Sequence, residues 1–139
     1  MSPALRGSVA VLLLRLMIGI AFIIHGWTKI QNPLHWLDMM PGHPPGVLQA
    51  LAAVAEFGGG IGLVLGLLTP ACCAGIACTM LYALYVHISH GDPFASKGSG
   101  GSYELALVFL TMAVAVALLG PGRYSLDQRL LGRRIPNDY

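Results

Sequence analysis

Long apolar runs dominate the pattern of the chain. Four of them follow one another, at residues 8–30, 47–68, 71–90 and 103–120. A helix needs about 20 mostly apolar residues to cross the hydrocarbon core of a bilayer. Polar connections separate the first two runs and the last two, and a short Thr-Pro turn separates the middle two. The pattern predicts an all-α integral membrane protein, a four-helix up-and-down bundle that forms one domain over residues 1–139.

Composition supports a membrane location. The chain is 55% hydrophobic and 10% charged, whereas soluble proteins contain about 25% charged residues. The lipid bilayer is therefore the first expected partner. A net charge of +2 gives no reason to expect nucleic acid. The sequence also lacks the G-x-S-x-G, H-E-x-x-H, Walker A and dinucleotide-binding motifs, which disfavours a soluble type of hydrolase or dehydrogenase.

The positions of the basic residues predict how the chain is oriented across the membrane and predict a separate C-terminal tail. Most of them lie outside the first and fourth runs: Arg6, Arg123, Arg129, Arg133 and Arg134. The positive-inside rule then places both termini in the cytoplasm, with a cytoplasmic tail over 121–139. Ser125 and Gln128 have the spacing of a capping box. The leucines and arginines that follow predict a short amphipathic helix on the inner leaflet.

Two ionisable residues lie deep within the predicted spans. Arg15 belongs to one face of the first helix together with Gly19, Gly26 and Lys29. Glu56 lies near the middle of the second helix, about 6 Å from the level of Arg15 when depths are counted from the helix ends. We therefore expect an Arg15–Glu56 pair. It is either a structural ion pair that fixes helix pairing or a deep ligand or proton site.

A second group of polar residues is expected near the outer helix ends. With Arg15 and Glu56 it forms the predicted ligand or proton site, and its members are His25, Lys29, His87, His90, Tyr103 and Glu104. An apolar slot with a few donors suits a quinone. Haem held between two of these histidines is disfavoured, as is a metal, because no motif has ligand spacing. The alternative is a hydrated cluster at the helix ends.

Glycines recur on the second helix. Gly58, Gly62 and Gly66 form a G-x-x-x-G-x-x-x-G repeat on the face nearly opposite Glu56. This spacing lets helices approach closely. We expect the repeat to serve helix packing, either inside the bundle or at a subunit contact of a homo-oligomer.

Four segments in order resemble one known family. They are "RLMIGIAFIIHGWTKI", "AEFGGGIGLVLGLLTP", "HGDPF...GGSYELAL" and "GPGRYSLD". Together they resemble the DoxX family of small four-span membrane proteins. The family takes its name from a subunit of an archaeal terminal-oxidase and thiosulfate:quinone oxidoreductase system. The resemblance implies a protein of a bacterial or archaeal inner membrane that is associated with redox chemistry.

The leading functional hypothesis is a quinone-linked or redox-complex membrane subunit. Its polar site would bind a quinone head group or relay protons, and a membrane or redox protein partner would supply any electron-carrying cofactor. As an enzyme it would be at most a subunit of an oxidoreductase complex. A non-catalytic scaffold or assembly subunit is the alternative, and a small-solute transporter is less favoured because four short spans enclose a small pore.

Overall fold

This computed structural model describes residues 2–96, 98 and 100–130, and within them the chain forms five helices. Their bounds are α1 Pro3–Gln31, α2 Gly46–Leu65, α3 Thr69–Ser89, α4 Glu104–Leu119 and α5 Leu126–Leu130. Each of the four predicted spans is occupied by one helix. The predicted all-helical membrane bundle is therefore confirmed. Lys97, Arg133 and Arg134 lie outside the described residues.

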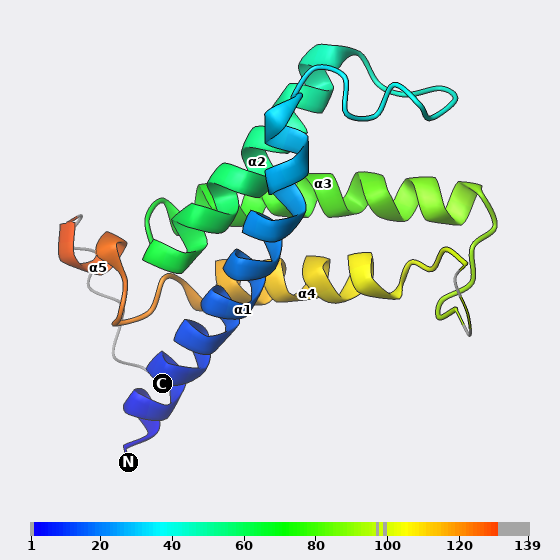
Figure 1. Ribbon diagram of the computed structural model, residues 1–139. Helices are drawn as coiled ribbons and strands as arrows, with labels where there is room; N and C mark the ends of the chain where they lie inside the picture. The colour runs from blue at the N-terminus through cyan, green and yellow to red at the C-terminus, as the bar shows by residue number, and fades with distance from the viewer. Residues whose placement is uncertain (1, 97, 99, 131–139) are drawn as a thin grey trace.

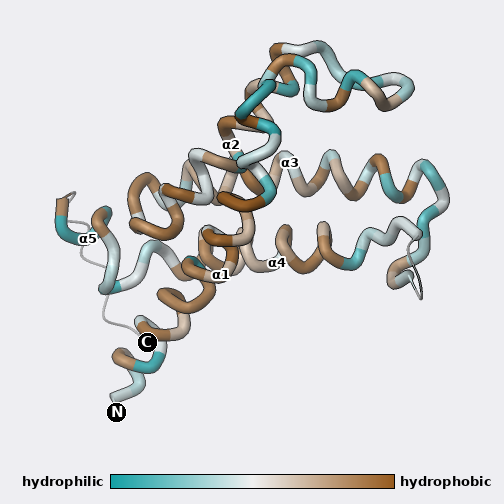
Figure 2. The backbone as a smooth tube through the Cα atoms, viewed as in Figure 1, coloured by the Kyte–Doolittle hydropathy of each residue, from teal (hydrophilic) through white to brown (hydrophobic). Residues whose placement is uncertain are grey.

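The helices have the length and composition of membrane spans. Within the described residues α1, α2 and α3 are long and apolar enough to cross a bilayer, and α4 is shorter, with 16 residues. Figure 2 shows that apolar residues follow the helices, while hydrophilic residues gather in the connections. The orientation of the two termini stays a prediction.

The helices form two antiparallel pairs. Contacts are most extensive between α1 and α2 and next between α3 and α4. Figure 1 shows the two pairs crossing rather than running side by side along their whole length. We call the end with the α2–α3 turn and α5 the turn end. The far end of each pair is its loop end, which carries the 32–45 loop in one pair and the connection from α3 to α4 in the other. Because the pairs cross, α2 and α3 are close at the turn end and diverge toward their loop ends.

Glycines set how α1 and α2 align. A Cβ atom on Gly26 would lie 2.6 Å from the backbone nitrogen of Phe57, and one on Gly19 would lie 2.8 Å from the Gly60 carbonyl oxygen. Real Cβ atoms do not approach backbone so closely, so only glycine fits at these points. The face of α1 that carries Gly19 and Gly26 therefore packs backbone to backbone on α2.

The predicted glycine repeat of α2 does not form one packing face. Gly62 lies against the Cys72 side chain of α3, and Gly66 ends α2 with a φ of 67° beside Arg15. A Cβ atom on Gly58 would meet nothing closer than a Val54 methyl group at 4.0 Å. The reason is that α1 packs against a different stripe of α2, on the side of Gly60.

The turn end is closed by a carboxylate from α5. Asp127 is 2% exposed, and its two side-chain oxygens accept the backbone N–H groups of Leu68 and Thr69 at 2.7 and 2.8 Å. Leu68 has a left-handed backbone, with φ 50°, and its own side chain cannot cap α3. Asp127 therefore acts as the helix cap of α3 from a distant part of the chain.

The predicted cap of the tail helix is confirmed in part. The Gln128 backbone N–H donates to the Ser125 hydroxyl at 3.1 Å, so Ser125 caps α5 as predicted. The Gln128 side-chain oxygen is buried without a hydrogen-bond partner among the described residues, so the reciprocal half of the capping box is absent. The predicted position of α5 on the inner leaflet is untested.

We expect Gly26→Ala to destabilise the protein by about 1–3 kcal/mol, the usual cost of overpacking a well-packed contact. The new methyl group would push α1 away from the Phe57 backbone. Gly58→Ala is the matched control, because a methyl group there has open space and alanine favours the helix. Thermal unfolding in detergent measures both. Equal melting temperatures for the two variants would contradict the proposed alignment of α1 on α2.

Candidate functional site

Glu56 pairs with a different cation from the one predicted. The Lys29 ammonium nitrogen lies 2.7 and 2.6 Å from the two carboxylate oxygens of Glu56. The Glu56 side chain is 3% exposed and that of Lys29 is 23% exposed. The predicted Arg15–Glu56 pair is therefore wrong, although the expectation that Glu56 has a basic partner on α1 is confirmed.

The error lies in the alignment of the two helices. Counted from the predicted outer ends, Gly26 would lie about 6 Å deep and Phe57 about 15 Å deep. The structure instead brings these two residues into direct contact. The beginning of α2 thus extends past the end of α1, which raises Glu56 to the level that the Lys29 side chain reaches. A lysine arm is long and flexible enough to close the remaining gap.

Arg15 has a separate role at the turn end. Its guanidinium donates to the carbonyl oxygens of Leu63 at 2.9 Å and Val64 at 3.3 Å, where α2 ends. One of its nitrogens also donates to the carbonyls of Pro121 and Tyr124, at 2.6 and 3.0 Å. Arg15 is 1% exposed. It adds a donor to the Leu63 carbonyl, which also accepts the Gly66 N–H, supplies one to the Val64 carbonyl, and ties the segment after α4 to α1 and α2.

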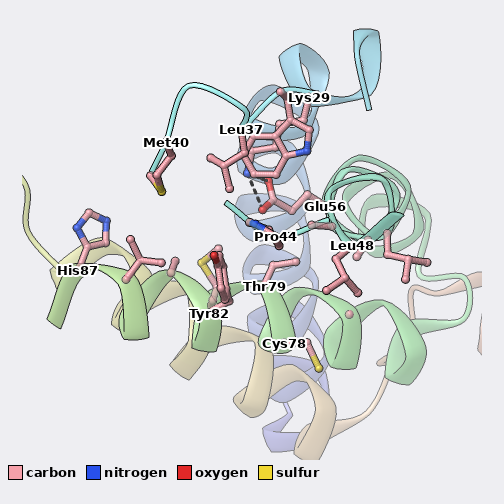
Figure 3. Close-up of a pocket in the computed structure, with 18 residues that line it drawn as sticks. Lys29, Leu37, Met40, Pro44, Leu48, Glu56, Cys78, Thr79, Tyr82 and His87 are labelled. Carbon is pink, nitrogen blue, oxygen red and sulfur yellow. Dashed lines mark hydrogen bonds and ion pairs between the residues drawn. The ribbon is translucent and has the colours of Figure 1, made fainter. Parts of the chain in front are cut away.

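A cavity of about 610 Å³ lies between α2, α3 and the 32–45 loop. Lys29 and Glu56 line it, and most of its other wall is apolar. Figure 3 shows the Lys29–Glu56 ion pair on one side of this space, with Tyr82 pointing from α3 toward it and His87 farther along α3. The volume falls within the range of small-molecule sites, about 300–1,000 Å³.

The 32–45 loop forms one wall of the cavity and is fastened by Gln49. This side chain is fully buried; its amide nitrogen donates to Asp38 at 2.9 Å, and its oxygen accepts the Leu37 N–H at 2.8 Å. The Trp36 indole N–H donates to the Gln49 backbone carbonyl at 3.0 Å. The hydrogen bond from Gln49, together with one from His35, holds the pKa of Asp38 below its usual value. One glutamine thus positions the loop over the cavity.

Trp36 connects this loop to the ion pair. The Lys29 ammonium lies 4.4 Å from the centre of the Trp36 ring. This contact is a cation–π interaction, which gains strength when the cation is removed from water. The ammonium is therefore held between a carboxylate and an indole face, at the boundary of an apolar cavity.

The predicted outer cluster is divided by the structure. His87 lines the cavity, and its Nδ1 lies 2.6 Å from an Asp92 carboxylate oxygen. His25 instead contacts Phe22 and Phe109, with ring centres 6.2 and 6.0 Å apart, on the side of α1 that faces α4.

The remaining members of that cluster lie at the connection between α3 and α4. His90 is exposed where α3 ends. The Tyr103 ring packs against Phe94, and the Glu104 N–H donates to the Phe94 carbonyl at 3.0 Å. None of the three lines the cavity. Among the described residues no three His, Cys, Asp or Glu side chains gather in a way that could hold a metal ion.

Comparison with known proteins identifies the family. The DoxX family model matches residues 10–88, more than half of the chain. The chain belongs to the DoxX family. The inner membrane protein YqjF of Escherichia coli strain K12 is 32% identical over 128 residues, which are 91% of this chain and 95% of that protein. No solved structure matches the chain. The resemblance deduced from the four sequence segments is confirmed.

The cavity of this DoxX protein offers a ligand a charged hydrogen-bond donor, the Lys29 ammonium. Two of the three protons on the Lys29 ammonium are directed to the Glu56 oxygens, and the cation can offer the third to an acceptor in the cavity. A carbonyl or phenolic oxygen is such an acceptor. The surrounding apolar wall suits the rest of an amphipathic molecule.

Two residues of this DoxX protein were missed by sequence analysis as organisers of the structure. Gln49 holds the loop, and Asp127 caps α3. An amide in the first turn of an otherwise apolar helix was the available indication for Gln49. Asp127 lies shortly after the Gly-Pro-Gly break, at the start of a predicted helix, where an acidic residue often caps a helix. Its target, α3, is more than 50 residues away in the sequence.

Proposed function

We propose that this DoxX protein is a quinone-binding membrane subunit that works with a redox partner. The cavity between α2, α3 and the 32–45 loop would hold the quinone head group. The observation that carries the proposal is the Lys29 ammonium, fixed on Glu56 and Trp36 at the wall of an apolar cavity. A quinone carbonyl would accept the free proton of that ammonium, and the ring would occupy the apolar space.

The site by itself supports binding and proton exchange rather than electron transfer. Glu56 and Lys29 together can supply or accept a proton near a quinone oxygen, and His87 lies along the same cavity. Electrons would come from a partner protein that carries a redox cofactor, in keeping with the membrane-subunit role that the family resemblance implies.

Quenching of Trp36 fluorescence tests the proposal. The chain has two tryptophans, so Trp27→Phe leaves Trp36 as the only reporter at the cavity wall. Titration of the nanodisc-embedded variant with decylubiquinone is expected to quench this fluorescence in a saturable way. A di-O-methylated quinol analogue, which lacks the quenching quinone ring, should compete for the site and reverse the effect.

A cavity-filling variant supplies the specificity control. In the Trp27→Phe background, Ala52→Phe adds a ring inside the cavity and should weaken binding about tenfold or more, since overpacking costs about 1–3 kcal/mol. Ala117→Phe adds the same ring on an exposed face of α4 and should change nothing. Quenching that never saturates, or that is equal in both variants, would overturn the proposal.

A further inference from the structure

Some sides of the cavity are closed by helix contacts or by the loop, and one side is open. The open side indicates where a ligand can enter. At the turn end α2 and α3 are in contact: a Cβ atom on Gly75 would lie 3.2 Å from the Ala55 Cβ, and one on Gly59 would lie 3.4 Å from Ile76. The Gly62 backbone lies directly against the Cys72 sulfur. The cavity therefore begins where these contacts end, and it is closed toward the turn end.

The 32–45 loop covers another side. Trp36, Leu37, Met40 and Pro44 of this loop line the cavity. The loop is held in place by the hydrogen bonds of the fully buried Gln49. Its other surface carries the exposed polar side chains of the segment, which are His35, Asp38 and His43. The loop thus presents apolar side chains to the cavity, while its outer surface carries these polar side chains together with the exposed Leu34 and Met39.

The remaining edge lies between α2 and α3. Leu48 and Leu51 of α2 are 53% and 60% exposed although they line the cavity. Tyr82 of α3 is 42% exposed, and Cys78 is also exposed. In Figure 3, Tyr82 and Leu48 lie on the same side of α3 as Lys29 and Glu56, and Cys78 lies on the opposite side of that helix. Within membrane-spanning helices an exposed apolar edge faces lipid.

From this geometry we infer that the cavity is a lateral site for a tailed amphiphile. The polar head reaches Lys29 and Glu56, and the apolar tail leaves between α2 and α3 into the bilayer past Leu51 and Cys78. The inference rests on the proposed function and deepens it: the ligand class is a quinone with a long apolar tail that enters from the lipid phase. A small water-soluble solute would not enter through such an opening, because it does not partition into the lipid phase.

Two probes with the same head group separate the contribution of the head group to binding from that of the tail. They are decylubiquinone and the tail-less 2,3-dimethoxy-5-methyl-1,4-benzoquinone, titrated by calorimetry into the detergent-solubilised full-length protein. Leu51→Trp places a bulky ring at the lateral edge, and Leu105→Trp on exposed α4 is the matched control. Comparing each variant with wild type for one probe cancels the partition of that probe into detergent.

We expect Leu51→Trp to raise the Kd for decylubiquinone about tenfold, the affinity that burial of roughly two methylene groups supplies. The Kd for the tail-less probe should stay unchanged, and Leu105→Trp should alter neither. Equal melting temperatures for both variants and wild type show that the fold is retained.

Other outcomes have distinct meanings. If both probes bind and Leu51→Trp alters neither, or alters both equally, the lateral opening is wrong while quinone binding stands. If Met40→Trp on the loop weakens decylubiquinone instead, the tail leaves at the 32–45 loop and the inference is overturned. If neither probe binds wild type in a saturable way, the proposed function falls and the inference falls with it.

Discussion

Replacement of Arg15 by methionine is expected to destabilise the protein by about 3 kcal/mol or more. Its guanidinium makes four hydrogen bonds to backbone carbonyls of α2 and the 121–124 segment. Hydrogen bonds within membrane proteins average about 0.6 kcal/mol each, so the four together supply roughly 2.4 kcal/mol. The loss is larger because the carbonyls of Val64, Pro121 and Tyr124 lose the guanidinium as their donor.

The geometry of arginine is essential to this role. Lysine keeps the positive charge, which favours a helix C-terminus, but it cannot direct donors in the planar fork that reaches two separate segments. Arg15→Lys should therefore recover only part of the loss. Arg123→Met is the control, because Arg123 is exposed in the same tail segment. Thermal unfolding in detergent ranks the variants, and an Arg15→Met variant as stable as Arg123→Met would refute the assigned role.

Single and double replacements of the Lys29–Glu56 pair should differ sharply in their effect on the stability of the protein. Lys29→Met leaves the Glu56 carboxylate, 3% exposed, without its cation, and should cost about 3 kcal/mol. Glu56→Gln should cost less, because Lys29 is partly exposed and its long side chain can turn toward the surface. In the double variant Lys29→Met/Glu56→Gln no unpaired charge remains. Its stability should return to within about 1 kcal/mol of wild type.

Quinone binding in the double variant then separates the two roles of the pair. If the pair contacts the ligand, the stable double variant should lose about 10- to 100-fold in affinity, the value of a hydrogen bond from a charged donor. The Trp36 quenching assay measures this in the Trp27→Phe background. Full affinity in a stable double variant would mean that the pair serves only to fix α1 against α2.

Much of the fold could be predicted because its causes are local. The length and hydropathy of the four apolar runs require helices in a bilayer, since unpaired backbone groups are costly there. The cap at Ser125 follows from its spacing to Gln128, and α4 ends at Leu119, one residue before the end of the fourth apolar run. The face of α1 that carries Arg15, Gly19, Gly26 and Lys29 was also recognisable, because it follows from the period of a single helix.

The candidate site was predicted less completely because it depends on alignment between helices. Lys29, Glu56 and His87 were named as site residues and do line one cavity. Their grouping with His25 was wrong, since His25 packs on Phe109 across a different face of α1. Periodicity gives the angle of a residue around its own helix. It does not give the angle at which two helices cross, and here that crossing opens the cavity.

The sequence by itself determined that this is a helical membrane protein, that it is a DoxX protein, and that Glu56 needs a basic partner on α1. Tertiary structure alone decided that the partner is Lys29, because the contacts of Gly26 with Phe57 and of Gly19 with Gly60 set the alignment of α1 on α2. It also decided that Arg15 and Asp127 close the turn end. These roles depend on long-range contacts, and a shift of about two helical turns between neighbouring helices leaves every local pattern in the sequence unchanged.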